Sequence, residues 1–191
     1  MTRIIGGTAG GRRLRTPPGE ATRPTSDRVR EALFSALESQ LGSLSGLRFL
    51  DLYAGSGAVG LEARSRGAAS VTAVESDRRT ARLVTQNAAL VGLDGVDVLA
   101  QPVLRSVAAT TRAPYDVVFA DPPYPTGNDE VEAVLSSLRE HGWVAEDSLV
   151  VVERSARTPE PAWPDGWERL RVREYGETVL WYVRADSPAA D

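Results

Sequence analysis

The stretch FLDLYAGSGAVG, residues 49–60, decides the fold of this 191-residue chain. An apolar run ends at Leu52 and glycines follow at once, which permit a tight turn and let a ligand approach the backbone closely. A helix is expected to begin near Gly57. Glu75 lies about 20 positions after the glycines, at the end of the next apolar run, where a carboxylate accepts hydrogen bonds from ribose hydroxyls. The segment predicts a strand, a glycine turn and a helix at a ligand site.

Apolar runs and helical stretches alternate along the chain from this segment onward. The apolar runs are residues 49–52, 71–74, 96–99, 117–120 and 149–152, and the helical stretches begin near 57, cross 79–90 and cover about 130–140. Such alternation predicts right-handed crossovers and a parallel sheet covered on both faces. Residues 170–174 and 178–183 flank a Tyr-Gly-Glu turn as a hairpin would. We therefore expect a doubly wound α/β fold with a mostly parallel seven-stranded sheet and a C-terminal antiparallel hairpin.

The N-terminal part of the chain has a different pattern. Residues 3–14 hold glycine pairs between short apolar or basic runs, which predicts a hairpin arm. A helix follows, with Ser26 as its N-cap and Gly42 as its stop. Three parts are predicted: an arm over residues 1–25, a catalytic domain over 26–184 and a flexible tail over 185–191.

Composition and charge narrow the class of protein. Hydrophobic residues at 42% and charged residues at 25% are ordinary for a globular domain. Because no apolar run reaches the roughly 18 residues of a membrane span and no secretory signal is visible, we expect a cytoplasmic protein without a membrane partner. We also expect a monomer. The lack of cysteine and the single histidine, His141, predict no metal site.

The charge is unevenly distributed. Residues 1–30 contain seven arginines against two acidic residues, a balance of +5, which leaves −9 for the rest of a chain of net charge −4. A basic arm on an acidic body is typical of proteins that bind polyanions. We therefore expect Arg12, Arg13 and Arg15 to contact phosphates.

The glycine turn alone fits a nicotinamide-dependent oxidoreductase as well as a methyltransferase. Asp51 favours the second class, since a carboxylate before the glycines would face the ammonium of a methionyl group but repel a pyrophosphate. The chain also leaves little room for the substrate domain that a dehydrogenase usually carries.

The string Asp121-Pro122-Pro123-Tyr124 follows the apolar run 117–120. An amine on an aromatic base is a poor nucleophile, because its lone pair is delocalised into the ring. The Asp121 carboxylate and the Pro122 carbonyl could each accept one N–H and turn the lone pair toward a methyl donor. Consecutive prolines fix the backbone, and Tyr124 offers a flat face for stacking.

Three segments resemble known enzymes. FLDLYAGSGAVG resembles motif I of the S-adenosylmethionine-dependent methyltransferases, and DPPY resembles motif IV of the amino-methyltransferases that act on adenine, cytosine or guanine. RIIGGTAGGRRL and TRPTSDRVREALFSAL, residues 3–14 and 22–37, resemble the N-terminal region of the bacterial 16S ribosomal RNA guanine 2-amino methyltransferases. Together these similarities span nearly the whole chain.

The resemblance implies that S-adenosylmethionine is the cofactor and that 16S ribosomal RNA, in a small-subunit particle, is the partner. It implies three groups of site residues: Asp51, Tyr53, Ala54, Gly55, Gly57, Glu75, Ser76, Gln101 and the Val103 amide on the cofactor, residues 121–124 in catalysis, and Arg23, Thr25 and Arg28 beside the RNA. Two alternatives remain, a DNA adenine 6-amino methyltransferase and an NAD-dependent oxidoreductase.

Overall fold

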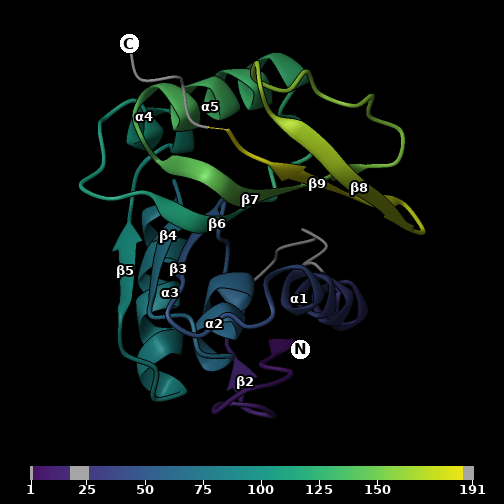
Figure 1. The fold of residues 1–191 in the computed structure, drawn as a ribbon. Helices are drawn as coiled ribbons and strands as arrows, with labels where there is room; N and C mark the ends of the chain where they lie inside the picture. Colours follow the sequence, from purple (N-terminus) through teal and green to yellow (C-terminus); the bar gives the residue numbers. More distant parts are fainter. Residues whose placement is uncertain (1, 18–25, 187–191) are drawn as a thin grey trace.

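A computed structural model describes residues 2–17 and 26–186. Figure 1 shows one large sheet with helices on both sides and a short hairpin beside the N-terminus. The strands are β1 (Thr2–Arg3), β2 (Arg13–Leu14), β3 (Arg48–Leu52), β4 (Ser70–Val74), β5 (Val96–Leu99), β6 (Tyr115–Ala120), β7 (Val144–Ser155), β8 (Glu168–Tyr175) and β9 (Thr178–Arg184). The helices are α1 (Asp27–Leu41), α2 (Ala58–Ser65), α3 (Arg78–Leu90), α4 (Val103–Val107) and α5 (Asn128–Glu140).

The large sheet has seven strands in the order β5-β4-β3-β6-β7-β9-β8. β5, β4, β3, β6 and β7 are parallel to one another, whereas β9 is antiparallel to both β7 and β8. The predicted doubly wound, mostly parallel sheet with a C-terminal antiparallel hairpin is therefore confirmed.

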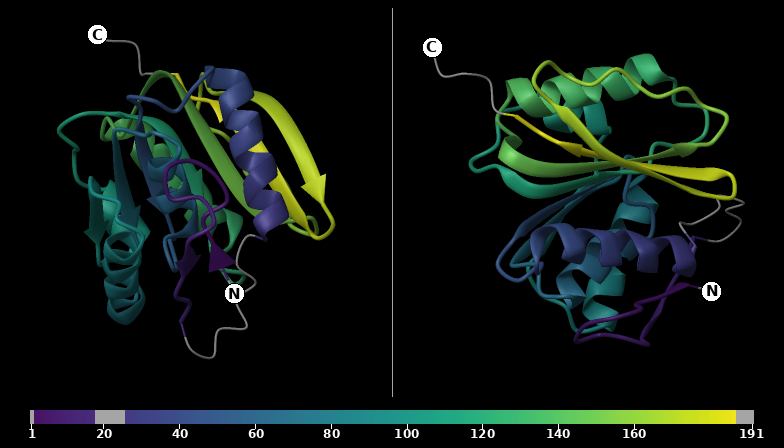
Figure 2. Two further views of the ribbon diagram at one scale, coloured as in Figure 1. Left: turned by 90° about the horizontal axis from the view of Figure 1, so that it is seen from below. Right: turned by 45° about the vertical axis from the view of Figure 1, so that its right-hand side comes forward.

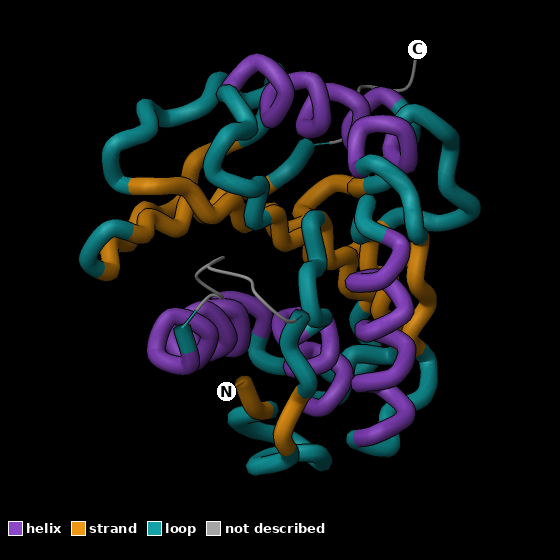
Figure 3. Tube along the Cα trace, turned by 180° about the vertical axis from the view of Figure 1, so that it is seen from behind, coloured by secondary structure: helices purple, strands orange, loops and turns teal. Residues whose placement is uncertain are grey.

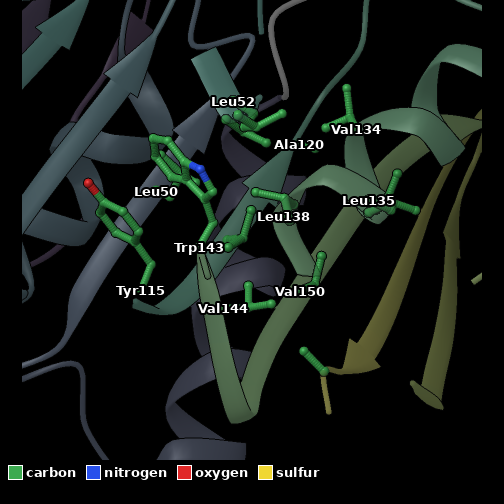
Figure 4. Close-up of a cluster of buried hydrophobic side chains, with 14 of the residues drawn as sticks. Leu50, Leu52, Tyr115, Ala120, Val134, Leu135, Leu138, Trp143, Val144 and Val150 are labelled. Atoms are coloured by element: carbon green, nitrogen blue, oxygen red, sulfur yellow. The ribbon is translucent and has the colours of Figure 1, made fainter. Parts of the chain in front are cut away.

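Both faces of the sheet are covered by helices, which explains why the central strands are apolar without alternation. On one face, α1 and α2 pack on a cluster that includes Phe34, Phe49 and Val151. On the other face, α4 and α5 pack on a cluster in which the rings of Tyr115 and Trp143 stack with centroids 5.7 Å apart (Figure 4). Figure 2 shows the two helical layers on opposite sides of the sheet.

Helix α1 begins and ends where the sequence predicts. The Ser26 hydroxyl accepts a hydrogen bond from the Val29 amide at 3.2 Å, which satisfies one of the free donors of the first turn. Gly42 ends the helix at a φ of 78°, a value that glycine adopts without strain.

The described part of the arm packs against the body of the protein. β1 and β2 form the predicted antiparallel hairpin, although each has only two residues. Ile4 and Leu14 are buried in a third cluster with Leu61 of α2 and Val91 just after α3. Figure 3 shows this N-terminal segment against the helical layer, away from the C-terminus. The predicted boundary at residue 25 falls in the range 18–25, which lies outside the described residues.

Three details differ from the sequence prediction. β7 has 12 residues instead of the predicted run of four, because its first part also pairs with β6. α4 was not predicted, since five residues are too few for a helical period to show. Ala185, assigned to the flexible tail, is buried, and its amide donates to the Ser148 carbonyl at 2.8 Å.

In the described part of the chain, no helix is both long enough and apolar enough to cross a bilayer.

Candidate active site

The candidate site lies where the order of the strands reverses, between β3 and β6. Ligands of open α/β sheets bind at the carboxyl ends of the strands at such a point. Leu52 pairs with Ala120, and the Asp121 amide lies 3.4 Å from the Leu52 carbonyl oxygen. The glycine turn after β3 and the string 121–124 after β6 therefore begin side by side.

Two glycines shape the turn. Gly57 has a φ of 82°, and a Cβ there would lie 2.7 Å from Cγ1 of Val84 on α3. Gly55 has a φ of 56°, and no atom lies within 4 Å of the position of a Cβ. Gly57 therefore lets the turn pack on α3, whereas the open space beside Gly55 lets a ligand approach the backbone.

Glu75 connects the turn to the next crossover. Its carboxylate accepts one hydrogen bond from the Gly55 amide and another from the Asp77 amide, both at 2.9 Å. Glu75 is half-buried and Ser76 is exposed, with its hydroxyl 3.5 Å from the Glu75 carboxylate. Because a carboxylate can accept more than two hydrogen bonds, Glu75 keeps acceptor capacity for a ligand while it holds the turn in place.

Asp51 is almost fully buried behind the turn. Its carboxylate accepts a hydrogen bond from the Gly60 amide at 2.9 Å, in the first turn of α2. Burial raises the pKa of Asp51 to about 7, and the nearby charges of Asp121 and Glu75 act in the same direction, while the bond from Gly60 opposes them. Asp51 braces the start of α2, and its contact with a methionyl ammonium stays a prediction.

Tyr53 has a φ of 59°, which is unusual for a residue other than glycine. Its ring packs against the cluster under α5, and its hydroxyl is buried without a hydrogen-bond partner among the described residues. Burial raises the pKa of Tyr53 to about 12, with Glu130 raising it further and Arg154 lowering it. The contacts of Tyr53 and Ala54 with the cofactor stay predictions.

The predicted adenine contacts lie at the start of α4. Gln101 is half-buried and the side chain of Val103 is buried in the core, so only the amide of Val103 is suited to a ligand contact. Pro102 is the N-cap of α4 and has no amide hydrogen of its own.

The string after β6 turns outward. Pro122 is buried and Pro123 is exposed, and the Thr126 amide donates to the Pro123 carbonyl at 2.9 Å. Tyr124 is 86% exposed, the most open large hydrophobic side chain among those in the described ranges. An exposed aromatic ring beside a strand end is suited to stacking on a flat ligand.

Sequence reasoning missed Arg154 and Asn128. Arg154, at the end of β7, donates from Nη2 to the Thr126 carbonyl at 2.8 Å and to Oδ1 of Asn128 at 3.2 Å. Asn128 in turn donates to the Pro159 carbonyl at 3.0 Å. These bonds join the loop after β6 to the loop after β7. No local pattern could reveal them, because the partners are 26 to 31 residues apart.

The arginines predicted to contact RNA differ in their surroundings. Arg12 donates to the Val91 carbonyl at 2.6 Å, so it also fastens the arm to the end of α3. The side chains of Arg13, Arg15 and Arg28 are exposed. Arg23 and Thr25 lie outside the described residues.

Asn87 links the arm to the glycine turn. It lies inside α3 and is fully buried. Its side chain exchanges two 2.9 Å hydrogen bonds with the backbone of Arg15 and donates a third, also 2.9 Å, to the Ser56 carbonyl. The end of the described arm is therefore tied to the ligand turn.

His141 is the C-cap of α5, with Nδ1 3.1 Å from the Ser137 carbonyl oxygen. In residues 2–17 and 26–186, no three histidine or acidic side chains gather in a group that could hold a metal ion.

Known proteins resemble this chain over almost its whole length. Residues 2–184 match the family described as conserved hypothetical protein 95. The ribosomal RNA small subunit methyltransferase D of Escherichia coli is 37% identical over 177 residues, which cover 93% of this chain and 86% of that protein. The protein of the same name from Haemophilus influenzae is 33% identical, covering 91% and 89%. The solved structure of yhhF from Escherichia coli has a TM-score of 0.87 at 32% identity and covers 98% of this chain and 99% of its own.

Proposed function

We propose a function for this chain from the family to which it belongs, that of conserved hypothetical protein 95 and of the ribosomal RNA small subunit methyltransferase D. The proposed function is transfer of a methyl group from S-adenosylmethionine to the exocyclic 2-amino group of a guanine in small-subunit ribosomal RNA, in the cytoplasm. The observation that supports it most strongly is the pairing of Leu52 with Ala120, because it sets the glycine turn beside the amine-binding string.

The residues present fit this cofactor. The open space beside Gly55 would admit a ligand against the backbone, and the half-buried Glu75 retains acceptor capacity for ribose hydroxyls. The amide of Val103 would serve the adenine. When bound, S-adenosylmethionine supplies an electrophilic methyl group on a sulfonium.

The string 121–124 would hold the nucleophile. The Asp121 carboxylate and the Pro122 carbonyl each accept one N–H of the target amine, which favours the pyramidal nitrogen of the transition state. Burial of Pro122 keeps that carbonyl fixed, and the exposed ring of Tyr124 stacks on the base. The proton of the methylated amine leaves toward the Asp121 carboxylate or solvent.

Similarity supports ribosomal RNA over the alternatives. The relatives from Escherichia coli and Haemophilus influenzae, which align over 86% and 89% of their length, are named ribosomal RNA small subunit methyltransferases. The described residues form one seven-stranded sheet with its helices and a two-stranded hairpin. The test is incubation with labelled S-adenosylmethionine and methyl-deficient small subunits, large subunits or duplex DNA. We expect label in the small subunit alone. Label in DNA alone, or tight binding of NAD without binding of S-adenosylmethionine, would reject the proposal.

A further inference from the structure

A pocket opens beside Tyr124, the last residue of the string 121–124. Its volume is about 390 Å³, which is within the usual range for sites of small ligands. It is formed by the loop after β6 and the segment at the end of β7. The lining residues are Tyr124, Pro125, Thr126, Gly127, Asn128, Arg154, Thr158 and Pro159. The exposed ring of Tyr124 belongs to this lining, so a base stacked on Tyr124 would extend into the pocket.

Among the described residues that line the pocket, Arg154 alone carries a charge. It is only 7% exposed, and a buried arginine is uncommon unless its donors are used. Nη2 donates to Thr126 and Asn128, whereas Nε is buried without a partner in the described structure. The bonds of Nη2 fix the direction of the guanidinium, and the unpaired Nε leaves part of its donor capacity unused.

The surroundings of Arg154 affect its charge. Burial lowers the pKa of Arg154, while the charges of Tyr53 and Asp121 raise it. An arginine stays protonated in proteins, so the pocket keeps a positive donor. Asp121, an acceptor, lies near enough to Arg154 for its charge to act on the guanidinium. A ligand that spans both residues needs an N–H group at one end and an oxygen or nitrogen acceptor at the other.

Guanine has that arrangement of groups. Its 2-amino group donates hydrogen bonds at one end of the base, and O6 accepts them at the other end. Arginine is the most common partner of guanine O6 and N7, whereas adenine has an amino donor at position 6. We infer that Arg154 donates a hydrogen bond to O6 of the target guanine and thereby selects guanine while Asp121 holds the 2-amino group. This inference rests on the proposed function, because it assumes that the 2-amino group reacts.

The test compares two bases at the mapped target position. Small-subunit RNA is assembled from ligated fragments with either guanine or 2-aminopurine there, since 2-aminopurine keeps the 2-amino group but lacks O6. For the unmodified enzyme, we expect 2-aminopurine to lower kcat/KM by about 10- to 100-fold. Arg154→Gln should lower kcat/KM on guanine by a similar factor and lower it on 2-aminopurine by less than about threefold.

Equal losses on both bases in Arg154→Gln would overturn the inference, because a residue that only supports the loop or contacts a phosphate does not distinguish O6. Equal turnover of both bases by the unmodified enzyme would also overturn it, and this comparison stands even if the variant fails to fold. Arg157→Gln is the matched control, since Arg157 is three positions away, exposed, and paired with Glu177 at 3.3 Å. We expect it to leave both rates unchanged.

Failure of the proposed function would be a different result. In that case, the unmodified enzyme would place no methyl group on the 2-amino group of guanine in unsubstituted RNA. The inference on Arg154 fails instead when this methylation occurs but does not depend on O6.

Discussion

At the scale of single residues, the two aspartates of the site have opposite surroundings. Asp51 is almost fully buried and bound to the Gly60 amide, whereas Asp121 is half-buried at the end of β6. The first is suited to holding the turn and the second to contacting a substrate. Their substitution should therefore have different effects.

Replacing Asp121 with alanine should abolish most turnover without loss of cofactor affinity. A preorganised acceptor that acts only in the transition state is worth roughly 100- to 1000-fold in kcat. The measurement is single-turnover methyl transfer together with calorimetric titration of S-adenosylmethionine. If the variant turned over at a comparable rate, Asp121 would not contact the target amine.

Asp51 should make stability depend on pH. Its pKa is raised from 3.8 to about 7 by burial, so the folded protein binds this proton more tightly than the unfolded chain does. The stability that the folded protein gains by holding this proton is fully present below pH 3.8 and is lost as the pH rises through about 7. The unmodified protein therefore loses stability as the pH rises from 5 to 7, whereas Asp51→Asn has no carboxyl to titrate. The free energy of unfolding of the variant, relative to that of the unmodified protein, should rise by about 1.4 kcal/mol for each pH unit in this range.

Urea unfolding of both proteins at pH 5, 6, 7 and 8 measures this difference. A constant difference across the range would mean that Asp51 titrates normally. Asparagine can still accept the Gly60 hydrogen bond, so the local structure of α2 should persist.

At the scale of elements, Asn87 connects α3, the arm and the glycine turn through three hydrogen bonds. Replacing it with alanine leaves buried partners without a bond, each at a cost of about 1 to 3 kcal/mol. We expect Asn87→Ala to lower the unfolding temperature and to weaken S-adenosylmethionine binding severalfold, because Ser56 belongs to the turn. Gln86→Ala is the matched control, since Gln86 is exposed on the same helix. If both variants unfolded at the same temperature, the hydrogen bonds of the Asn87 side chain would not stabilise the protein.

Local signals explain which elements the sequence could predict. Ser26 and Gly42 mark α1, and the spacing from Gly55 to Glu75 marks the first crossover, because in each case residues close in sequence are close in space. Arg154 and Asn128 meet only after the sheet has formed, so no periodicity identifies them.

Arg30 illustrates the same limit. From the sequence alone, a helical arginine near a basic arm fits a solvated helix face and an RNA contact equally well. In the structure it is fully buried and donates to the Arg3 carbonyl at 2.5 Å and to Asp27 at 3.0 Å. Its hydrogen bond to β1, which is distant in sequence, makes Arg30 a buried structural residue instead of a solvated one.

At the scale of the whole molecule, the asymmetry of charge predicts how RNA binding depends on salt. Arg13 and Arg15 have exposed side chains, and the Arg15 backbone bonds survive a side-chain substitution. Changing both to alanine should flatten the dependence of RNA affinity on salt by up to about two units of slope, at roughly 0.7 to 0.9 per phosphate. Filter binding at several salt concentrations measures this slope.

Arg12 should behave differently, since its guanidinium donates to the Val91 carbonyl. Arg12→Ala should therefore lower the unfolding temperature, which the double change of Arg13 and Arg15 should leave nearly unaltered. An unchanged salt slope in the double variant would exclude these two residues as the phosphate contacts.

The chemical identity of the product tests the proposed reaction most directly. Small-subunit RNA methylated by the purified enzyme is digested to nucleosides, and the labelled nucleoside is identified by chromatography and mass spectrometry. We predict that all the transferred label lies in guanosine methylated on its 2-amino group, at a single position. Label in adenosine methylated on its 6-amino group, or in a ribose, would contradict the assignment of residues 121–124 to a guanine 2-amino group.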